Sequence, residues 1–229
     1  MIYYRQEKNF LVARVVLAEL PVDIQEQIER GVSILKQGGL VAFPTDTVYG
    51  LGACANLSPA VERVYRMKGR PQNMALPLLL ADTSQISEVA QSVPPIAWLL
   101  ANNFLPGALT LVLPKSSSVP DIITAGGKTV AVRIPAHPVP VALAKSLGTP
   151  IVGTSANLSG EPSALTAEEV YSQFGDKIDL VIEGGRCPGG IESTVVDVTG
   201  ETPVVLREGA ISREELKKVC GNIAYKEAK

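Results

Sequence analysis

Cysteine and histidine are both scarce in this chain, which narrows the chemistry that it can perform. Its three cysteines, Cys54, Cys187 and Cys220, are an odd number and lack the C-x-x-C spacing of structural zinc sites. The sequence has a single histidine, His137, and no Gly-x-Ser-x-Gly motif that could supply a nucleophilic serine for it. A hydrogen-bonded loop residue is the simpler interpretation of His137. We therefore predict no disulfide framework, no His/Cys metal centre and no catalytic triad, and expect a cytoplasmic location.

Aromatic side chains, long apolar runs and excess charge are also lacking. Aromatic residues make up 5% of the chain and hydrophobic residues 46%, which predicts a core of Val, Leu, Ile and Ala. No apolar run approaches the ~18–20 residues that span a bilayer, and residues 1–10 are too polar for a signal peptide, so we expect no membrane contact. A net charge of -2 gives no global attraction to nucleic acid.

Helical and strand patterns alternate along most of the chain, and its end is rich in strands. This order predicts an α/β fold with a single twisted, open, mixed sheet flanked by helices. We expect one domain at 21–220, preceded by a lead-in at 1–20 with an edge strand at 11–20 and followed by a frayed tail at 221–229. The expected helices cover 21–37, 58–68, 82–90, 94–103, 138–147, 166–174 and 213–219. The expected strands cover 40–43, 76–81, 109–113, 129–134, 150–152, 180–182, 194–198 and 204–206, with a glycine-rich turn at 50–55 and a flexible loop at 114–128.

Polar turns follow several of the expected strands, and they carry four cations in all. The first turn follows the apolar run that ends at Pro44, where small hydroxyl residues can bind a ligand or their own backbone. Arg133 and Arg207 each close an apolar strand, and a single arginine there is either solvated at the rim or directed at an anion. If the sheet gathers these turns, they suit a polyanion such as a nucleotide triphosphate. The set comprises Thr45, Thr47, Tyr49, Lys68, Arg70, Arg133, Thr154, Ser155, Asn157, Ser193, Thr194 and Arg207.

Two familiar nucleotide-binding motifs are incomplete here. Gly127-Lys128-Thr129 resembles the end of a P-loop, but Ile122 stands where that motif requires glycine. Gly50 and Gly52 resemble a dinucleotide fingerprint, but Asn56 to Pro59 intervene before the next helix. Neither motif is predicted to bind a nucleotide.

Six short motifs, taken together and in order, resemble the YrdC-like family of threonylcarbamoyl-AMP synthases. The resemblance covers roughly residues 25–215 and includes a Lys-x-Arg pair followed by Ser-x-Asn. Each motif is weak alone, but their order and spacing make a specific signal. The motifs are Phe43 to Gly52, Lys68-Gly69-Arg70-Pro71, Pro106 to Leu111, Val132-Arg133-Ile134-Pro135, Ser155-Ala156-Asn157 and Glu192 to Asp197.

The resemblance implies an α/β domain with a cationic concave cavity and a particular reaction. L-threonine, bicarbonate (or CO₂) and ATP would give L-threonylcarbamoyl-adenylate and diphosphate, with Mg²⁺. The nucleophiles come from the substrates, so the protein would supply positioning and charge stabilisation. The product would pass to a separate threonylcarbamoyl transferase complex for tRNA t6A37 modification, and a contact with tRNA itself is a further expectation.

The same resemblance implies roles for ten residues, with Lys68 and Arg70 as the catalytic pair. It implies that threonine is held by Thr47, Arg133 and Ser193. It implies that ATP is held by Lys68, Arg70, Thr129, Ser155, Asn157, Ser163 and Arg207. No residue is expected to ligate a metal directly.

The chain departs from the family pattern at three positions. Met74 and Ala75 replace the usual Asn-Pro, and Leu79 stands where a histidine is common, which affects one nucleotide contact and one threonine contact. The chain ends about 20 residues after Arg207, so the short, single-domain type is expected.

Two other functions fit the same fold. One is an RNA-binding module for duplex RNA or tRNA, whose affinity would fall steeply with salt. The other is a carbamoyl-transfer relative of hydrogenase-maturation proteins, which carry further domains. An assay with ATP, bicarbonate and threonine distinguishes all three.

Overall fold

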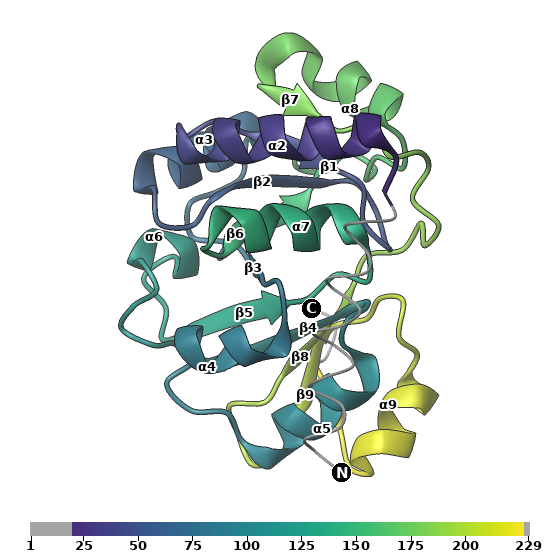
Figure 1. The fold of residues 1–229 in the computed structure, drawn as a ribbon. Coiled ribbons are helices and arrows are strands. Elements are labelled where there is room, and N and C mark those ends of the chain that lie inside the picture. The colour runs from purple at the N-terminus through teal and green to yellow at the C-terminus, as the bar shows by residue number, and fades with distance from the viewer. Residues whose placement is uncertain (1–19, 227–229) are drawn as a thin grey trace.

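The sheet at the centre of this protein contains both parallel and antiparallel strand pairs. The computed structural model describes residues 20–226, and within them ten strands form one sheet in the order β10-β9-β8-β4-β5-β3-β6-β2-β1-β7 (Figure 1). Four neighbouring pairs are parallel, namely β1/β7, β3/β5, β4/β8 and β9/β10, and the rest are antiparallel. The predicted mixed, open sheet flanked by helices is therefore confirmed.

The strands are short, and their order in the sheet differs widely from their order in the chain. Their bounds are β1 Val41–Phe43, β2 Gly50–Cys54, β3 Leu78–Leu79, β4 Leu109–Pro114, β5 Thr129–Arg133, β6 Ile151–Ser155, β7 Leu180–Val181, β8 Thr194–Asp197, β9 Val204–Arg207 and β10 Ala224–Tyr225. Helices connect the strands and cover both faces of the sheet. Their bounds are α2 Val22–Lys36, α3 Ser58–Lys68, α4 Ile86–Val89, α5 Pro95–Phe104, α6 Asp121–Thr124, α7 Pro138–Leu147, α8 Ala167–Phe174 and α9 Arg213–Cys220, with 3₁₀ turns at Thr83–Gln85 and Gly175–Lys177.

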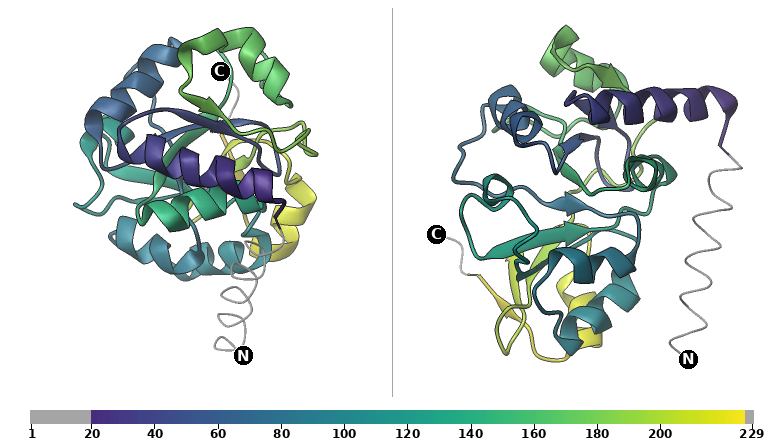
Figure 2. Two further views of the ribbon diagram at one scale, coloured as in Figure 1. Left: turned by 45° about the horizontal axis from the view of Figure 1, so that its top comes forward. Right: turned by 60° about the vertical axis from the view of Figure 1, so that its left-hand side comes forward.

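Helices α2 and α7 lie side by side over one face of the sheet, as both views in Figure 2 show. Apolar residues at Ile24, Ile28, Val32 and Leu35 recur at helical spacing and place one buried stripe of α2 in this layer. Residues of α3, α5 and α8 belong to the larger hydrophobic cluster on the other side. The two layers give the strands between them buried positions on both faces, as the run from Leu40 to Phe43 predicted.

One central strand was not predicted. Residues 50–55 were expected to form a glycine-rich turn, but Gly50–Cys54 is β2, paired with both β1 and β6. A Cβ on Gly50 would lie 2.8 Å from the ring of Phe43, and one on Gly52 would lie 2.6 Å from Ile151. The glycines therefore serve close packing between neighbouring side chains, and the β-propensity of the segment is weak for that reason.

Several boundaries also differ from the sequence prediction. Helix α6 lies inside the predicted loop 114–128, β6 runs on to Ser155, and β3 keeps only Leu78–Leu79 of the expected 76–81. Helix α3 has the predicted bounds, with Leu57 at its N-cap, and His137 caps α7 by accepting a 3.3 Å hydrogen bond from the amide of Val139. Strand β10 pairs with β9, so this part of the expected tail belongs to the sheet. The edge strand expected at 11–20 lies almost entirely outside the described residues.

Candidate functional site

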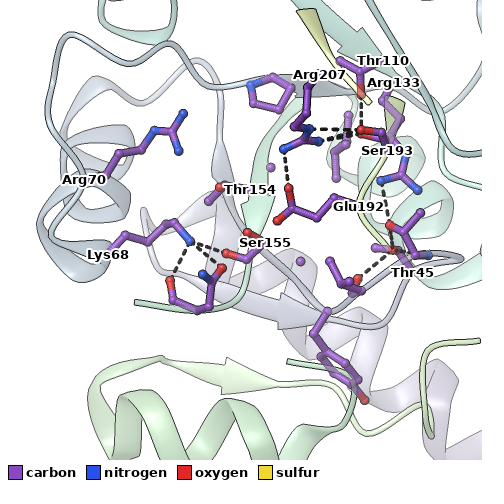
Figure 3. Close-up of a pocket in the computed structure, with 18 of the residues that line it drawn as sticks. Thr45, Lys68, Arg70, Thr110, Arg133, Thr154, Ser155, Glu192, Ser193 and Arg207 are labelled. Atoms are coloured by element: carbon purple, nitrogen blue, oxygen red, sulfur yellow. Dashed lines mark hydrogen bonds and ion pairs between the residues drawn. The ribbon is translucent and has the colours of Figure 1, made fainter. Parts of the chain in front are cut away.

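A cavity of about 260 Å³ opens over the middle of the sheet, and polar side chains line it (Figure 3). Pro77, Leu79 and Gly153 form part of its apolar wall. Eight of the ten predicted site residues line this cavity, although they come from segments far apart in the chain. They are Thr47, Lys68, Arg70, Arg133, Ser155, Asn157, Ser193 and Arg207.

Lys68 ends helix α3 and is only 2% exposed. Its ammonium donates to the carbonyl oxygen of Ser155 at 2.5 Å, to that of Asn157 at 2.6 Å and to Oδ1 of Asn157 at 3.1 Å. These three bonds use all three N–H donors of a lysine. Burial, together with the charge of Arg70, lowers the pKa of Lys68 to about 8. Lys68 thus carries a charge at neutral pH and holds the turn that follows β6.

Arg70 lies just beyond Gly69, whose positive φ of 60° ends the helix. Its Nε donates to the carbonyl of Met74 at 3.2 Å and its Nη2 to the carbonyl of Ala75 at 3.0 Å. Both acceptors are backbone carbonyl oxygens. The guanidinium is therefore held independently of the side chains at 74 and 75, where this sequence differs from the family pattern. Burial lowers the pKa of Arg70, and three of its five N–H bonds remain available within the described residues.

Arg133 ends strand β5 in a buried ion pair with Asp46 at 2.7 Å. The side chains of the pair are only 10% and 15% exposed. Arg133 also donates to Oγ1 of Thr47 at 2.9 Å and to the carbonyl of Gly107 at 3.0 Å. Burial lowers the pKa of Arg133, and the charge of Asp46 opposes this effect. The turn after β1 is thereby fastened to β5, with the Thr47 hydroxyl in the cavity.

Arg207 ends strand β9 and is tied to the residues that precede β8. Its Nε and Nη2 donate to the carbonyl of Ser193 at 3.2 and 2.9 Å, and Nη2 also contacts the Ser193 hydroxyl at 3.2 Å. The Ser193 hydroxyl lies 2.8 Å from that of Thr110 on β4. The remaining nitrogen of Arg207 forms an ion pair with Glu192. Arg207 and Ser193 therefore act as one hydrogen-bonded group in the cavity wall.

Two predicted residues lie outside the cavity lining. Thr129 begins β5 and pairs with Pro114, four residues from Arg133 at the far end of the same strand. Ser163 donates to Oε1 of Glu192 at 2.9 Å, so it reaches the cavity only through that carboxylate. The structure therefore does not bring Thr129 to the other nucleotide candidates.

Sequence reasoning also missed residues that the structure places at the site. Glu192 and Asp46 each neutralise one arginine, and Thr110 contacts Ser193. Glu192 and Asp46 both stand within motifs that were noticed, but only their neighbours were singled out. The pairs join positions up to 87 residues apart, and no local spacing reveals such a contact.

The described residues do not form a metal centre of their own. Within residues 20–226 no three His, Cys, Asp or Glu side chains are grouped so that they could hold a metal ion. The acidic residue of the cavity lining is Glu192, and Arg207 occupies it. The donor set of the described residues therefore does not fit a resident cation. Separately, no helix in the described part of the chain has the length and apolar character needed to cross a bilayer.

An open mixed sheet with four cations around one hydroxyl-rich cavity defines an α/β domain suited to binding anions. A family model described as "Telomere recombination", the Sua5/YciO/YrdC model, matches residues 33–209. This chain belongs to the Sua5/YciO/YrdC family.

Two relatives and two solved structures illustrate the range of similarity. The threonylcarbamoyl-AMP synthase of Pyrococcus abyssi is 45% identical over 207 residues, and that of Bacillus subtilis is 43% identical over 198 residues. The matches cover 88% and 86% of this chain but only 61% and 57% of those two proteins. A solved structure of P. abyssi Sua5 complexed with L-threonine has a TM-score of 0.85 at 46% identity, covering 87% of this chain and 58% of that one. The structure of Escherichia coli YciO has a TM-score of 0.76 at 32% identity, covering 84% and 93%.

Proposed function

We propose that this protein makes L-threonylcarbamoyl-adenylate and diphosphate from L-threonine, bicarbonate or CO₂, and ATP. The observation that carries the proposal is the single cavity lined by Lys68, Arg70, Arg133 and Arg207 together with hydroxyl groups. Such a cavity suits two anionic substrates held side by side. The names of the P. abyssi and B. subtilis relatives support the same reaction.

Threonine would bind at the side of the cavity formed by Arg133, Thr47 and Ser193. Arg133 uses three of its five N–H bonds on Asp46, Thr47 and Gly107, which leaves two for a substrate carboxylate. Because Asp46 and Gly107 fix the guanidinium, little side-chain entropy is lost when the carboxylate binds. The structure of P. abyssi Sua5 complexed with L-threonine supports threonine as a ligand, while the residues that hold it are part of the proposal.

ATP would bind across the cavity, between Arg70 and Arg207. Arg70 retains the most N–H bonds for phosphate oxygens, while Lys68 places a charge beneath the turn that carries Ser155 and Asn157. These residues, with Mg²⁺ arriving on the nucleotide, balance the charge of the phosphates. Thr129 and Ser163 lie outside the lining and are weaker candidates for ATP contacts.

The chemistry needs no nucleophile from the protein. The amine of threonine attacks the carbon of CO₂, or of bicarbonate with loss of water, and gives a carbamate. A carbamate oxygen then attacks the α-phosphorus, and the bond to the β,γ-diphosphate breaks. The protein lowers the barrier by holding two anions together and by stabilising the charge that moves onto the leaving diphosphate.

A release assay tests this proposal. Diphosphate should form only when ATP, threonine and bicarbonate are all present, and omission of threonine should abolish it. ATP hydrolysis without threonine, or no turnover with all three substrates, would contradict the proposal. Delivery of the adenylate to a cytoplasmic threonylcarbamoyl transferase complex, and a contact with tRNA, are further parts of the proposal.

The pH dependence of nucleotide binding should follow Lys68. Its pKa is lowered to about 8, so the ammonium loses its proton as the pH rises through that value. The charge beneath the turn and one donor of its three hydrogen bonds are then lost, and we expect MgATP affinity to fall by about tenfold between neutral pH and one unit above this pKa. Calorimetric titrations at several pH values check this. The same titrations on K68M should give a nearly flat profile, and an equally steep fall in K68M would refute the assignment to Lys68.

Gly189 should be required for threonine binding because it packs on the turn that carries Thr47. A Cβ at this position would lie 2.6 Å from the carbonyl oxygen of Asp46 and 2.9 Å from Cα of Thr47. We expect G189A to displace this turn, to weaken threonine binding about tenfold and to lower the free energy of unfolding by about 1–3 kcal/mol. G200A is the matched control, since its Cβ would meet only Thr202 at 3.9 Å. Equal threonine affinity in the two variants would contradict the expected role.

A further inference from the structure

The cavity proposed to bind anions contains one ionised carboxylate of its own. We propose that Glu192 is an internal counter-ion, which occupies Arg207 when no substrate is bound and is displaced by an incoming phosphate. This inference rests on the proposed nucleotide site and concerns how that site exchanges its ligands.

The contacts of Glu192 place its carboxylate between two sides of the cavity. Figure 3 shows it between Arg207 on one side and Ser155 on the other. One oxygen forms the ion pair with Arg207, and the other accepts a 2.9 Å hydrogen bond from the hydroxyl of Ser163. The backbone of Glu192 is fixed, since its carbonyl accepts a 2.9 Å bond from the amide of Ala210. The side chain, in contrast, is 33% exposed.

The carboxylate remains charged in these surroundings. Burial alone would raise the pKa of Glu192, but the charge of Arg207, hydrogen bonds from Ser163 and Ser155, and the charge of Lys68 outweigh burial and lower it. An ionised carboxylate beside a phosphate is repulsive, and the repulsion is strong where water is partly excluded. Glu192 and a nucleotide phosphate therefore compete for Arg207.

The hydrogen bonds of the Arg207 guanidinium bring the carboxylate and an incoming phosphate to the same nitrogen atom. The N–H bonds of its Nε and Nη2 are directed at Ser193, so Nη1 is the nitrogen that can bind an external anion, and Glu192 accepts one of the two N–H bonds of Nη1. A phosphate on the other Nη1 N–H bond would lie directly beside the charged carboxylate, and we expect the repulsion between the two anions to displace the carboxylate. When diphosphate is the product, return of Glu192 to Arg207 assists its release. The structure thus assigns Glu192 a positioning role, in which it limits how tightly the cavity retains phosphate.

Calorimetric titration of inorganic diphosphate and of MgATP into wild-type protein and E192Q tests this inference. The amide of E192Q keeps the shape and the hydrogen-bonding capacity of the side chain but removes the charge. We expect both ligands to bind E192Q about three- to tenfold more tightly, a range set by the partial exposure of the pair. The kinetic signature is a lower KM for ATP with stronger inhibition by diphosphate. E208Q is the control, because Glu208 forms an exposed ion pair with Arg213 away from the cavity lining, and it should bind as the wild type does.

A double variant tests whether the effect of E192Q on binding depends on Arg207. The gain from E192Q should shrink when R207Q is also present, because the two residues act as a pair. Unchanged or weaker diphosphate binding in E192Q, or the same gain with and without R207Q, would overturn the inference. Loss of threonine affinity in E192Q, with unchanged ATP affinity, would also overturn it and would assign the carboxylate to the substrate ammonium. Wild-type protein that binds neither diphosphate nor MgATP would instead defeat the proposed nucleotide site as a whole.

Discussion

Replacing Lys68 by methionine should lower the rate of diphosphate release by about 100-fold or more. The substitution removes from the cavity a charge that would help to stabilise the leaving diphosphate, and it removes the three hydrogen bonds that hold the turn at Ser155 and Asn157. Loss of preorganised electrostatic stabilisation of this kind costs about 10²–10³ in turnover. The free energy of unfolding should fall by about 1–3 kcal/mol, because the acceptors at Ser155 and Asn157 lose their donor. Initial rates and thermal unfolding of the same preparations measure both effects.

Lys128 offers a matched control for this experiment. It lies in the Gly-Lys-Thr sequence that resembles a P-loop, but its side chain is exposed and outside the cavity lining. K128M should leave turnover within about twofold of wild type, as substitutions at exposed positions usually do. Equal losses in K68M and K128M would contradict the location of the site. Full activity in K68M would remove Lys68 from the mechanism.

Replacing Arg133 by alanine should produce the largest loss of stability, about 3–5 kcal/mol in the free energy of unfolding. The substitution leaves Asp46 buried without its partner, since the two side chains are 10% and 15% exposed. It also removes the hydrogen bond to Thr47, so threonine binding should be lost. Urea unfolding and calorimetric titration with threonine measure the two effects.

Two further variants distinguish loss of the buried Arg133–Asp46 ion pair from nonspecific destabilisation of the fold. R63A breaks a pair with Asp179 whose side chains are 35% and 37% exposed, and it should cost no more than about 1 kcal/mol. R133M combined with D46N removes both buried charges, so it should recover part of the stability that R133A loses while threonine binding stays absent. A loss in R133A no larger than in R63A would show that the buried pair contributes little.

Much of this fold followed from periodic patterns in the sequence, and much of the cavity from short motifs. The stripe of Ile24, Ile28 and Val32 predicted helix α2 because helical spacing is a local property. Strand β2 was missed because Gly50 and Gly52 serve the packing of Phe43, a contact that no local propensity describes. Local sequence patterns thus predicted an element when its residues are chosen for that element's own geometry. They failed when the residues are chosen to fit a neighbouring element.

The same division applies to the site. The order of the motifs identified Lys68 and Arg133 as site candidates, and both line the cavity. Glu192 and Asp46 were not predicted as site residues because their role depends on an ion pair with an arginine. Only the fold brings that arginine next to each of them. Thr129 was selected by resemblance, yet strand β5 carries it to the end opposite Arg133.

The most direct test of the proposed activity follows the carbon of bicarbonate. Wild-type protein should be incubated with ATP, radiolabelled bicarbonate and L-threonine, and the products should be separated and identified by mass. The account predicts label in a threonylcarbamoyl-adenylate that forms in step with diphosphate. No label should enter it when threonine is omitted, and the rate should fall about 100-fold or more when K68M replaces the wild type. Label that never enters an adenylate, under conditions in which the folded protein binds ATP and threonine, would contradict it.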